Sequence, residues 1–117
     1  MRILIIGSKY ATDEHISKAA QLILANTDPN EQHTLVTTEN PGFGQVASYL
    51  HDTYPNFHTE THIIDQHKPS AIQDMLNLGG DMCYAFFIDG LTSKTTTQYA
   101  NAARNIGIPT VNIVFEP

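Results

Sequence analysis

The chain has 117 residues, of which 41% are hydrophobic and 15% are charged, and this size and balance are typical of one compact domain over residues 1–117. Its formal net charge of -6 argues against a general nucleic-acid surface, because such a surface needs a basic face that releases counterions from phosphates. The single cysteine excludes an internal disulfide and a zinc site made of several cysteines. The apolar runs are too short for a signal peptide or membrane span. We therefore expect a cytoplasmic protein without a membrane partner.

In the first half of the chain, short apolar runs alternate with helical periodicities. Residues 2–6 and 33–37 are the apolar runs, and each predicts a strand. A helix that Thr12-Asp13 can cap follows the first strand and ends near Asn26, and a second helix ends at Tyr54-Pro55-Asn56. The apolar positions that define these helices are Ile16, Ala19, Ala20 and Ile23 in the first, and Phe43, Val46, Ala47 and Leu50 in the second.

The same alternation continues in the second half. The expected strands are residues 59–65, 82–88 and 110–115, of which 82–88 is the most apolar and predicts a central strand buried on both faces. A short helix is expected from Pro69 to Gly79-Gly80, with apolar positions Ile72, Met75 and Leu76. A longer helix is expected from a cap at Thr92 or Ser93 to Gly107 and Pro109, with apolar positions Tyr99, Ala102, Ala103 and Ile106.

The order of these elements predicts the fold class. Strands that alternate with helices indicate an α/β protein with a parallel sheet, and right-handed crossovers place helices on both faces of that sheet. We therefore expect a three-layer, Rossmann-like, doubly wound sheet of about five strands in the order 3-2-1-4-5, with four helices. Ligands of such sheets bind beyond the carboxyl ends of the strands, at the point where the winding reverses. Here that switch point lies between strands 1 and 4.

The loop after the first strand carries the first candidate binding residues. Gly7, Ser8 and Lys9 put a flexible backbone, a hydroxyl and a cation where a phosphate could accept hydrogen bonds and meet a positive charge. The alternative is an ordinary strand-to-helix turn with a solvated lysine. The tripeptide is neither a Walker loop nor a GxGxxG fingerprint, so it supports neither a P-loop NTPase nor an NAD enzyme, and we expect no cofactor.

The loop after the fourth strand is more informative. Residues 89–97 place hydroxyls and a lysine at the N-terminus of a helix, where free N–H groups and the helix dipole attract anions. Redundant helix capping is the alternative, but one cap does not need so many hydroxyl groups, so the binding interpretation is favoured. Its candidate residues are Asp89, Gly90, Thr92, Lys94 and Thr95.

Three further features are weaker. Gly42 and Gly44, after the second strand, either let the backbone approach the same ligand or form a plain turn. His58, His62 and His67 lack the spacing of a metal site and are interpreted as surface or edge histidines, so no metal is expected. Cys83 lies in the central strand and is interpreted as core packing.

Nearly the whole chain resembles the SLOG superfamily of Rossmann-like domains, in particular its small YspA-like branch. The opening Ile5-Ile6-Gly7-Ser8-Lys9 with Asp13 is similar to that family's strand, Gly-Ser-Arg and acidic helix start. The segment 86–109 is similar to its strand, Asp-Gly, Ser-x-Gly-Thr and helix before Gly-x-Pro, with Asp89, Gly90, Thr92 and Thr95 matching in place or type. The resemblance implies binding of a nucleotide-like small molecule.

One departure bears on catalysis. Related families, the cytokinin-activating phosphoribohydrolases and the nucleoside deoxyribosyltransferases, share a Gly-Thr-x-x-Glu pattern whose glutamate acts at the sugar, and Gln98 stands at that glutamate's place here. A glutamine can bond ribose hydroxyls but cannot act as an anionic nucleophile or general base.

The sequence therefore leaves three hypotheses. The first is binding or sensing of a small phosphorylated nucleotide-derived ligand, with Lys9 and Lys94 on phosphate and Asp89 or Gln98 on sugar. The second is an N-glycosidic enzyme that uses another carboxylate, and the third is an interaction module without a ligand. The exposed edges of strands 3 and 5 permit a homo-oligomer.

Overall fold

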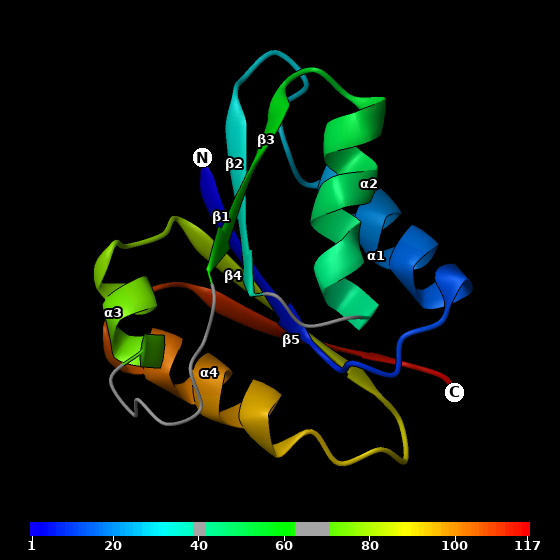
Figure 1. The fold of residues 1–117 in the computed structure, drawn as a ribbon, viewed down its shortest axis with the longest axis vertical. Helices are drawn as coiled ribbons and strands as arrows, with labels where there is room; N and C mark the ends of the chain where they lie inside the picture. The colour runs from blue at the N-terminus through cyan, green and yellow to red at the C-terminus, as the bar shows by residue number, and fades with distance from the viewer. Residues whose placement is uncertain (39–41, 63–70) are drawn as a thin grey trace.

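The computed structural model describes residues 1–38, 42–62 and 71–117, and in these ranges helices pack on both faces of a five-stranded sheet (Figure 1). In chain order the strands are β1 (Arg2–Gly7), β2 (His33–Thr38), β3 (Phe57–His62), β4 (Met82–Ile88) and β5 (Thr110–Phe115). The α-helices among the described residues are α1 (Asp13–Ala25), α2 (Gln45–Thr53), α3 (Ala71–Asn77) and α4 (Lys94–Asn105), and a short 3-10 helix, η1 (Gly42–Gly44), precedes α2.

The sheet has the predicted topology. Its strands are all parallel and lie in the order β3-β2-β1-β4-β5, so the winding reverses between β1 and β4. Residue Gly7 pairs with Phe86 in the register of these two strands, which brings their carboxyl ends to the same edge of the sheet. The fold prediction is therefore confirmed, and the switch point lies where the topology placed it.

The two faces of the sheet form two separate parts of the core, because successive side chains of a strand point to opposite faces. On the face covered by α1 and α2, Ile3 and Ile5 of β1 pack with Phe43 and Phe86. On the face covered by α3 and α4, Leu4 of β1 packs with side chains that include Ile6, Met75, Leu76, Cys83, Ala85 and Tyr99. The central strands β1 and β4 are buried on both faces, as their apolar sequences predict.

The first helix begins and ends where the sequence indicates. The Thr12 side chain accepts a hydrogen bond from the backbone N–H of His15, and the His15 ring accepts one from the Thr12 N–H, which completes a capping box. Asp13 and Glu14 stand in the first turn, where their negative charge is favourable, and Asn26 is the C-terminal cap.

Some boundaries differ from the expectation. Strand β3 begins at Phe57, two residues earlier than predicted, because the Phe57 ring packs against α2's side of the core. The predicted strand residues 63–65 and the helix start at Pro69 lie outside the described residues. Helix α4 ends at Asn105, and Ile106, expected at an apolar helical position, is 43% exposed at the C-terminal cap.

No helix in the described parts of the chain combines the length and apolar character that crossing a membrane requires.

Candidate functional site

The loops that follow β1 and β4 start side by side at the carboxyl edge of the sheet. The backbone N–H of Ser8 donates to the carbonyl oxygen of Phe86 at 3.2 Å, which continues the β1–β4 pairing by one residue. The Asp89 N–H donates to the Phe115 carbonyl oxygen at 2.8 Å, which ties the second loop to β5. Lys9 and Asp89, both exposed, therefore emerge from neighbouring strands.

Ser8 holds the first loop in shape. Its side chain is 4% exposed, and its Oγ accepts a hydrogen bond from the Tyr10 N–H at 3.2 Å, which is the geometry of a serine turn. Because the Ser8 N–H is committed to Phe86 and the Oγ to Tyr10, this residue closes the turn. The Ser8 N–H is thus used in the sheet and does not make the backbone contact expected with a phosphate, whereas the two bonds do not involve the Ser8 hydroxyl proton, and Lys9 is exposed.

The glycine-containing segment after β2 packs against the loop that follows β1. Gly42 has a φ of +80°, and a Cβ placed on it would lie 2.4 Å from the Ser8 carbonyl oxygen. The Phe43 N–H donates to the same oxygen at 3.4 Å. Gly42 is buried, and its close approach to the Ser8 backbone is what requires a glycine there. A Cβ constructed on Gly44 would lie 3.4 Å from the Thr38 carbonyl oxygen, which is at the limit of ordinary van der Waals contact.

The Phe43 ring fixes the position of this edge. It is fully buried and stacks on Phe86 and Phe115, with ring centroids 5.1 and 5.7 Å apart. A Cβ on Gly7 would come within 2.7 Å of the Phe43 ring, so the last residue of β1 must be small. The sequence identified Phe43 as a core residue but gave no sign that it joins the ends of β1, β4 and β5.

The β4–α4 loop, in contrast, is open to solvent. Asp89, Gly90, Leu91 and Thr92 are all exposed. Gly90 has a φ of +83° with no atom within 4 Å of a constructed Cβ, so the turn conformation is what favours glycine there. The predicted binding residues of this loop are thus exposed to solvent at the switch point.

The N-terminus of α4 has no side-chain cap. Ser93 occupies the N-cap position, but its hydroxyl donates to the Thr96 Oγ1 instead of accepting from a backbone N–H. Ser93 therefore takes the predicted N-cap position, but the side-chain cap expected there is not made, because the hydroxyl groups bond one another. The first turn also holds no acidic residue and begins with Lys94. In α1 the same position has a complete capping box and two carboxylates, so the two helices differ in how their N-terminal charge is compensated.

Two other predicted residues share this surface. Thr95 is exposed in the first turn of α4. Gln98 is exposed four residues after Lys94, a spacing that puts the two side chains next to each other on one side of the helix. The amide of Gln98 and the ammonium of Lys94 are therefore within reach of the same ligand.

The cations of the chain divide into two groups. Arg2 bonds Glu60, Lys18 bonds Glu14 at 3.1 Å, and Arg104 donates to Asn112 at 2.7 Å. Lys9 and Lys94 bond neither a carboxylate nor an amide side chain within residues 1–38, 42–62 and 71–117. The fourth lysine, Lys68, lies outside the described residues. Among the lysines of the described ranges, the two without such a partner are the two at the switch point.

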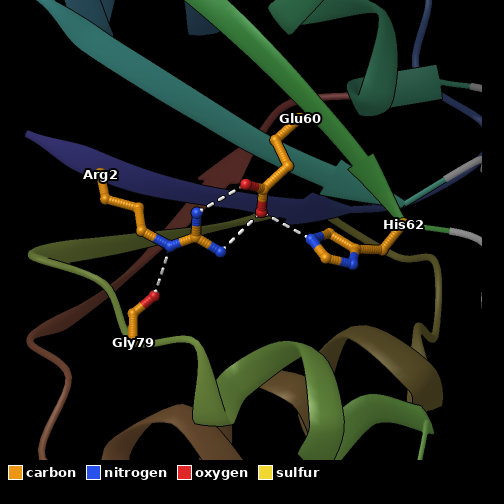
Figure 2. A network of polar contacts seen from close by, with 4 residues as sticks. All are labelled: Arg2, Glu60, His62 and Gly79. Carbon is orange, nitrogen blue, oxygen red and sulfur yellow. Dashed lines mark hydrogen bonds and ion pairs between the residues drawn. The ribbon is translucent and has the colours of Figure 1, made fainter.

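A polar network that the sequence did not reveal lies on the α3 and α4 face of the sheet (Figure 2). Arg2 forms two hydrogen bonds with the Glu60 carboxylate, at 2.8 and 2.6 Å, and its Nε donates to the Gly79 carbonyl oxygen at 2.8 Å. The His62 Nε2 lies 2.6 Å from Glu60 Oε2. The network ties the edge strand β3 to β1 across β2 and to the loop after α3, so His62 is an edge histidine with a structural partner.

The pKa of Glu60 makes this network sensitive to acid. Hydrogen bonds from Arg2 and then from His62 hold the pKa of Glu60 at about 2, below its ordinary 4.5, and Glu60 in turn raises the pKa of Arg2. A depressed carboxyl pKa contributes stability that is present above pH 4.5 and is lost as the pH falls toward about 2.

We therefore expect Glu60→Gln to reduce the acid sensitivity of the chain. Glu60 is 35% exposed, so water screens the pair, and the loss of unfolding free energy near neutral pH should be at most about 1 kcal/mol. Urea unfolding followed by circular dichroism at several pH values between 4.5 and 2 measures the effect. Glu31→Gln is the matched control: Glu31 is exposed and forms no ion pair within the described residues, so this variant should keep the acid sensitivity of the parent. An identical dependence in Glu60→Gln and the parent would contradict the assignment.

Other candidate residues are part of the core. Cys83 is buried, and burial raises the pKa of its thiol to about 11, which suppresses the thiolate needed for nucleophilic chemistry. Tyr99 and Met75 are also buried. Within the described ranges, no three histidine, cysteine or acidic side chains gather in a position to hold a metal ion.

No family model, curated protein or solved structure matches the chain. The resemblance to the SLOG superfamily, read from the two loop motifs, therefore stays a prediction.

Proposed function

We propose that the chain binds a small phosphorylated, nucleotide-derived ligand at the carboxyl edge of β1 and β4. The observation that carries the proposal is that the two lysines without an acidic or amide partner, among the described residues, follow adjacent strands at the switch point. In a chain of net charge -6, an anion gains most where such cations are not already neutralised. Lys9 and Lys94 are the proposed phosphate contacts.

The α4 N-terminus supports the same conclusion. Its first-turn N–H groups have no side-chain cap, and Lys94 adds a positive charge to the positive end of the helix dipole. A bound phosphate would satisfy those N–H groups and offset the charge. Thr92 and Thr95 offer hydroxyls to the same group, and Asp89 and Gln98 are the proposed sugar contacts. Gly7, Ser8, Gly42 and Gly44 are the residues proposed to shape the site.

Binding without turnover is the proposed activity. Gln98 carries an amide, which can bond sugar hydroxyls but supplies no general base. We place the chain, as part of the proposal, in the SLOG superfamily, whose loop motifs it resembles. Release of a free base from a nucleotide, followed chromatographically, would instead favour the N-glycosidic enzyme of the second hypothesis.

The two lysines give the first test of binding. We expect calorimetry to detect binding of a nucleoside monophosphate, ADP-ribose or a cyclic nucleotide, with an affinity that falls as salt is added. Lys9→Ala and Lys94→Ala should each lower the affinity about fivefold, the effect of losing an exposed charge pair worth about 1 kcal/mol.

Lys18→Ala is the matched control for net charge, because Lys18 is exposed but already paired with Glu14 on α1. It should leave the affinity within about twofold of the parent. Equal losses in all three variants would mean that the ligand responds to overall charge, and no binding of any of these compounds would overturn the proposal.

A further inference from the structure

Tyr10 carries a solvent-exposed aromatic ring at the proposed site. The residue is 62% exposed, the largest exposed fraction among the chain's described tyrosines, against 48% for Tyr49 and 37% for Tyr54. Tyr49 lies on the outer side of α2, and the Tyr54 ring packs edge-on against Phe57 at 6.3 Å. Tyr10 alone of these three follows β1 at the switch point, so its ring lies at the edge of the sheet where the ligand is proposed to bind.

Two contacts hold Tyr10 in place without covering it. The Tyr10 N–H donates to Ser8 Oγ at 3.2 Å, which fixes the backbone of this residue in the turn. The Lys9 ammonium lies over the ring, 5.2 Å from its centroid, which is a cation–π contact. A ring oriented in advance loses less conformational entropy when a partner stacks on it. The remaining exposed area is an apolar surface ready to be covered.

The neighbouring loop adds a second apolar group. Leu91, on the loop after β4, is 46% exposed, and its N–H donates to the Ile88 carbonyl oxygen at 3.1 Å. Since β1 and β4 are adjacent and parallel, the Tyr10 and Leu91 loops leave the same edge of the sheet. This edge thus presents apolar surface beside the cations Lys9 and Lys94, a combination that suits a ligand with an aromatic part and an anionic part.

We propose that Tyr10 stacks on the base of the bound ligand, so that the site takes nucleotides in preference to sugar phosphates. This inference rests on the proposed function and adds recognition of the base to recognition of the phosphate. A planar base stacks on the part of the ring that Lys9 leaves exposed, while the Lys9 ammonium, 5.2 Å from the ring centroid, contacts the phosphate. Stacking tolerates all four common bases, because each has a π face.

The test compares nucleotides with a sugar phosphate on the full chain. Calorimetry is run with AMP, GMP, CMP, UMP and ribose 5-phosphate, which all carry the same 5′-phosphate. The parent should bind at least one nucleotide about tenfold more tightly than ribose 5-phosphate, the size of one stacked base. Tyr10→Ala should remove about that factor for the nucleotide and leave ribose 5-phosphate unchanged.

Controls separate stacking from an altered loop. Tyr10→Phe keeps the ring and should keep the nucleotide affinity, and Tyr49→Ala removes an exposed tyrosine elsewhere and should change nothing. Circular dichroism shows whether each variant is folded, and if Tyr10→Ala is not folded, Tyr10→Leu serves in its place.

Each outcome decides the matter. Equal losses for nucleotide and sugar phosphate in Tyr10→Ala, or equal affinities of the parent for the two, would overturn stacking and leave the phosphate site standing. Binding of neither compound by the parent would overturn stacking on these nucleotides, and the same result with ADP-ribose and cyclic nucleotides would overturn the proposed function as well.

Discussion

Phe43→Ala should lower the free energy of unfolding by about 3–5 kcal/mol, the range for truncating a buried phenylalanine. The Phe43 ring is fully buried, and it stacks on Phe86 and Phe115. Removing it leaves a cavity beneath the ends of β1, β4 and β5, where the surrounding strands are hydrogen-bonded and cannot close in fully. Urea unfolding followed by circular dichroism, with the parent measured in parallel, gives the difference.

Two comparisons make this result specific. Phe43→Leu keeps most of the volume and should cost only about 1–2 kcal/mol, and Tyr49→Ala, on the exposed side of α2, should stay within about 0.5 kcal/mol. Gly7→Ala places a methyl group 2.7 Å from the Phe43 ring and 2.8 Å from the Phe43 Cβ. Because alanine keeps the Cβ, the cost of Gly7→Ala should fall only in part in the Phe43→Ala background. A loss below about 1 kcal/mol for Phe43→Ala would contradict this account of the edge.

The topology was predictable because its signals are local and strong. Strands β4 and β5 have the predicted boundaries, Met82–Ile88 and Thr110–Phe115. Strand β4 is a continuous apolar run because it is buried on both faces, whereas the edge strand β5 is partly exposed and is marked by its β-branched residues after Pro109. Helix α1 begins after Thr12, whose side chain makes the expected cap. Once the elements alternate, the handedness of the crossovers leaves few strand orders, and the order fixes the switch point.

The details of the site were not predictable, because they depend on contacts between distant segments. A glycine after a strand allows either a ligand or another segment of the chain to approach its backbone closely. Only the fold shows that Gly42 lies against the Ser8 backbone. The hydroxyl groups before α4 all favour capping, but the Ser93 hydroxyl bonds Thr96 instead. The sequence therefore located the candidate loops without separating the residues that face solvent from those that support them.

The Arg2–Glu60–His62 network shows the same limit. The alternation of β3 puts Glu60 and His62 on one face, which the sequence does indicate. Arg2 lies two strands away, however, and reaches Glu60 across β2. That Arg2 pairs with Glu60 can be inferred only when the strand order and the length of the arginine side chain are both known.

Gly42→Ala is the second substitution for which we expect a large loss, about 3–4 kcal/mol of unfolding free energy. Two costs add at this position. A φ of +80° is strained for any residue with a Cβ, and that Cβ would stand 2.4 Å from the Ser8 carbonyl oxygen and 2.8 Å from the Lys9 backbone. Neither contact involves a flexible side chain, so the first loop itself must move. Thermal or urea unfolding of the variant measures the sum.

Gly107→Ala separates the two costs. Gly107 has a similar φ of +88°, but a constructed Cβ there meets no atom within 4 Å, so its substitution should cost only the conformational strain of about 1–2 kcal/mol. The difference between the variants then measures the contact between the Gly42 and Ser8 loops. Equal losses would mean that the loops accommodate a methyl group without strain. A second measurement is nucleotide binding by Gly42→Ala at temperatures where the variant stays folded. Weaker binding there, together with a larger loss of unfolding free energy than in Gly107→Ala, would mean that the buried glycine controls the placement of Lys9. The packing contact would then serve the proposed site as well as the fold.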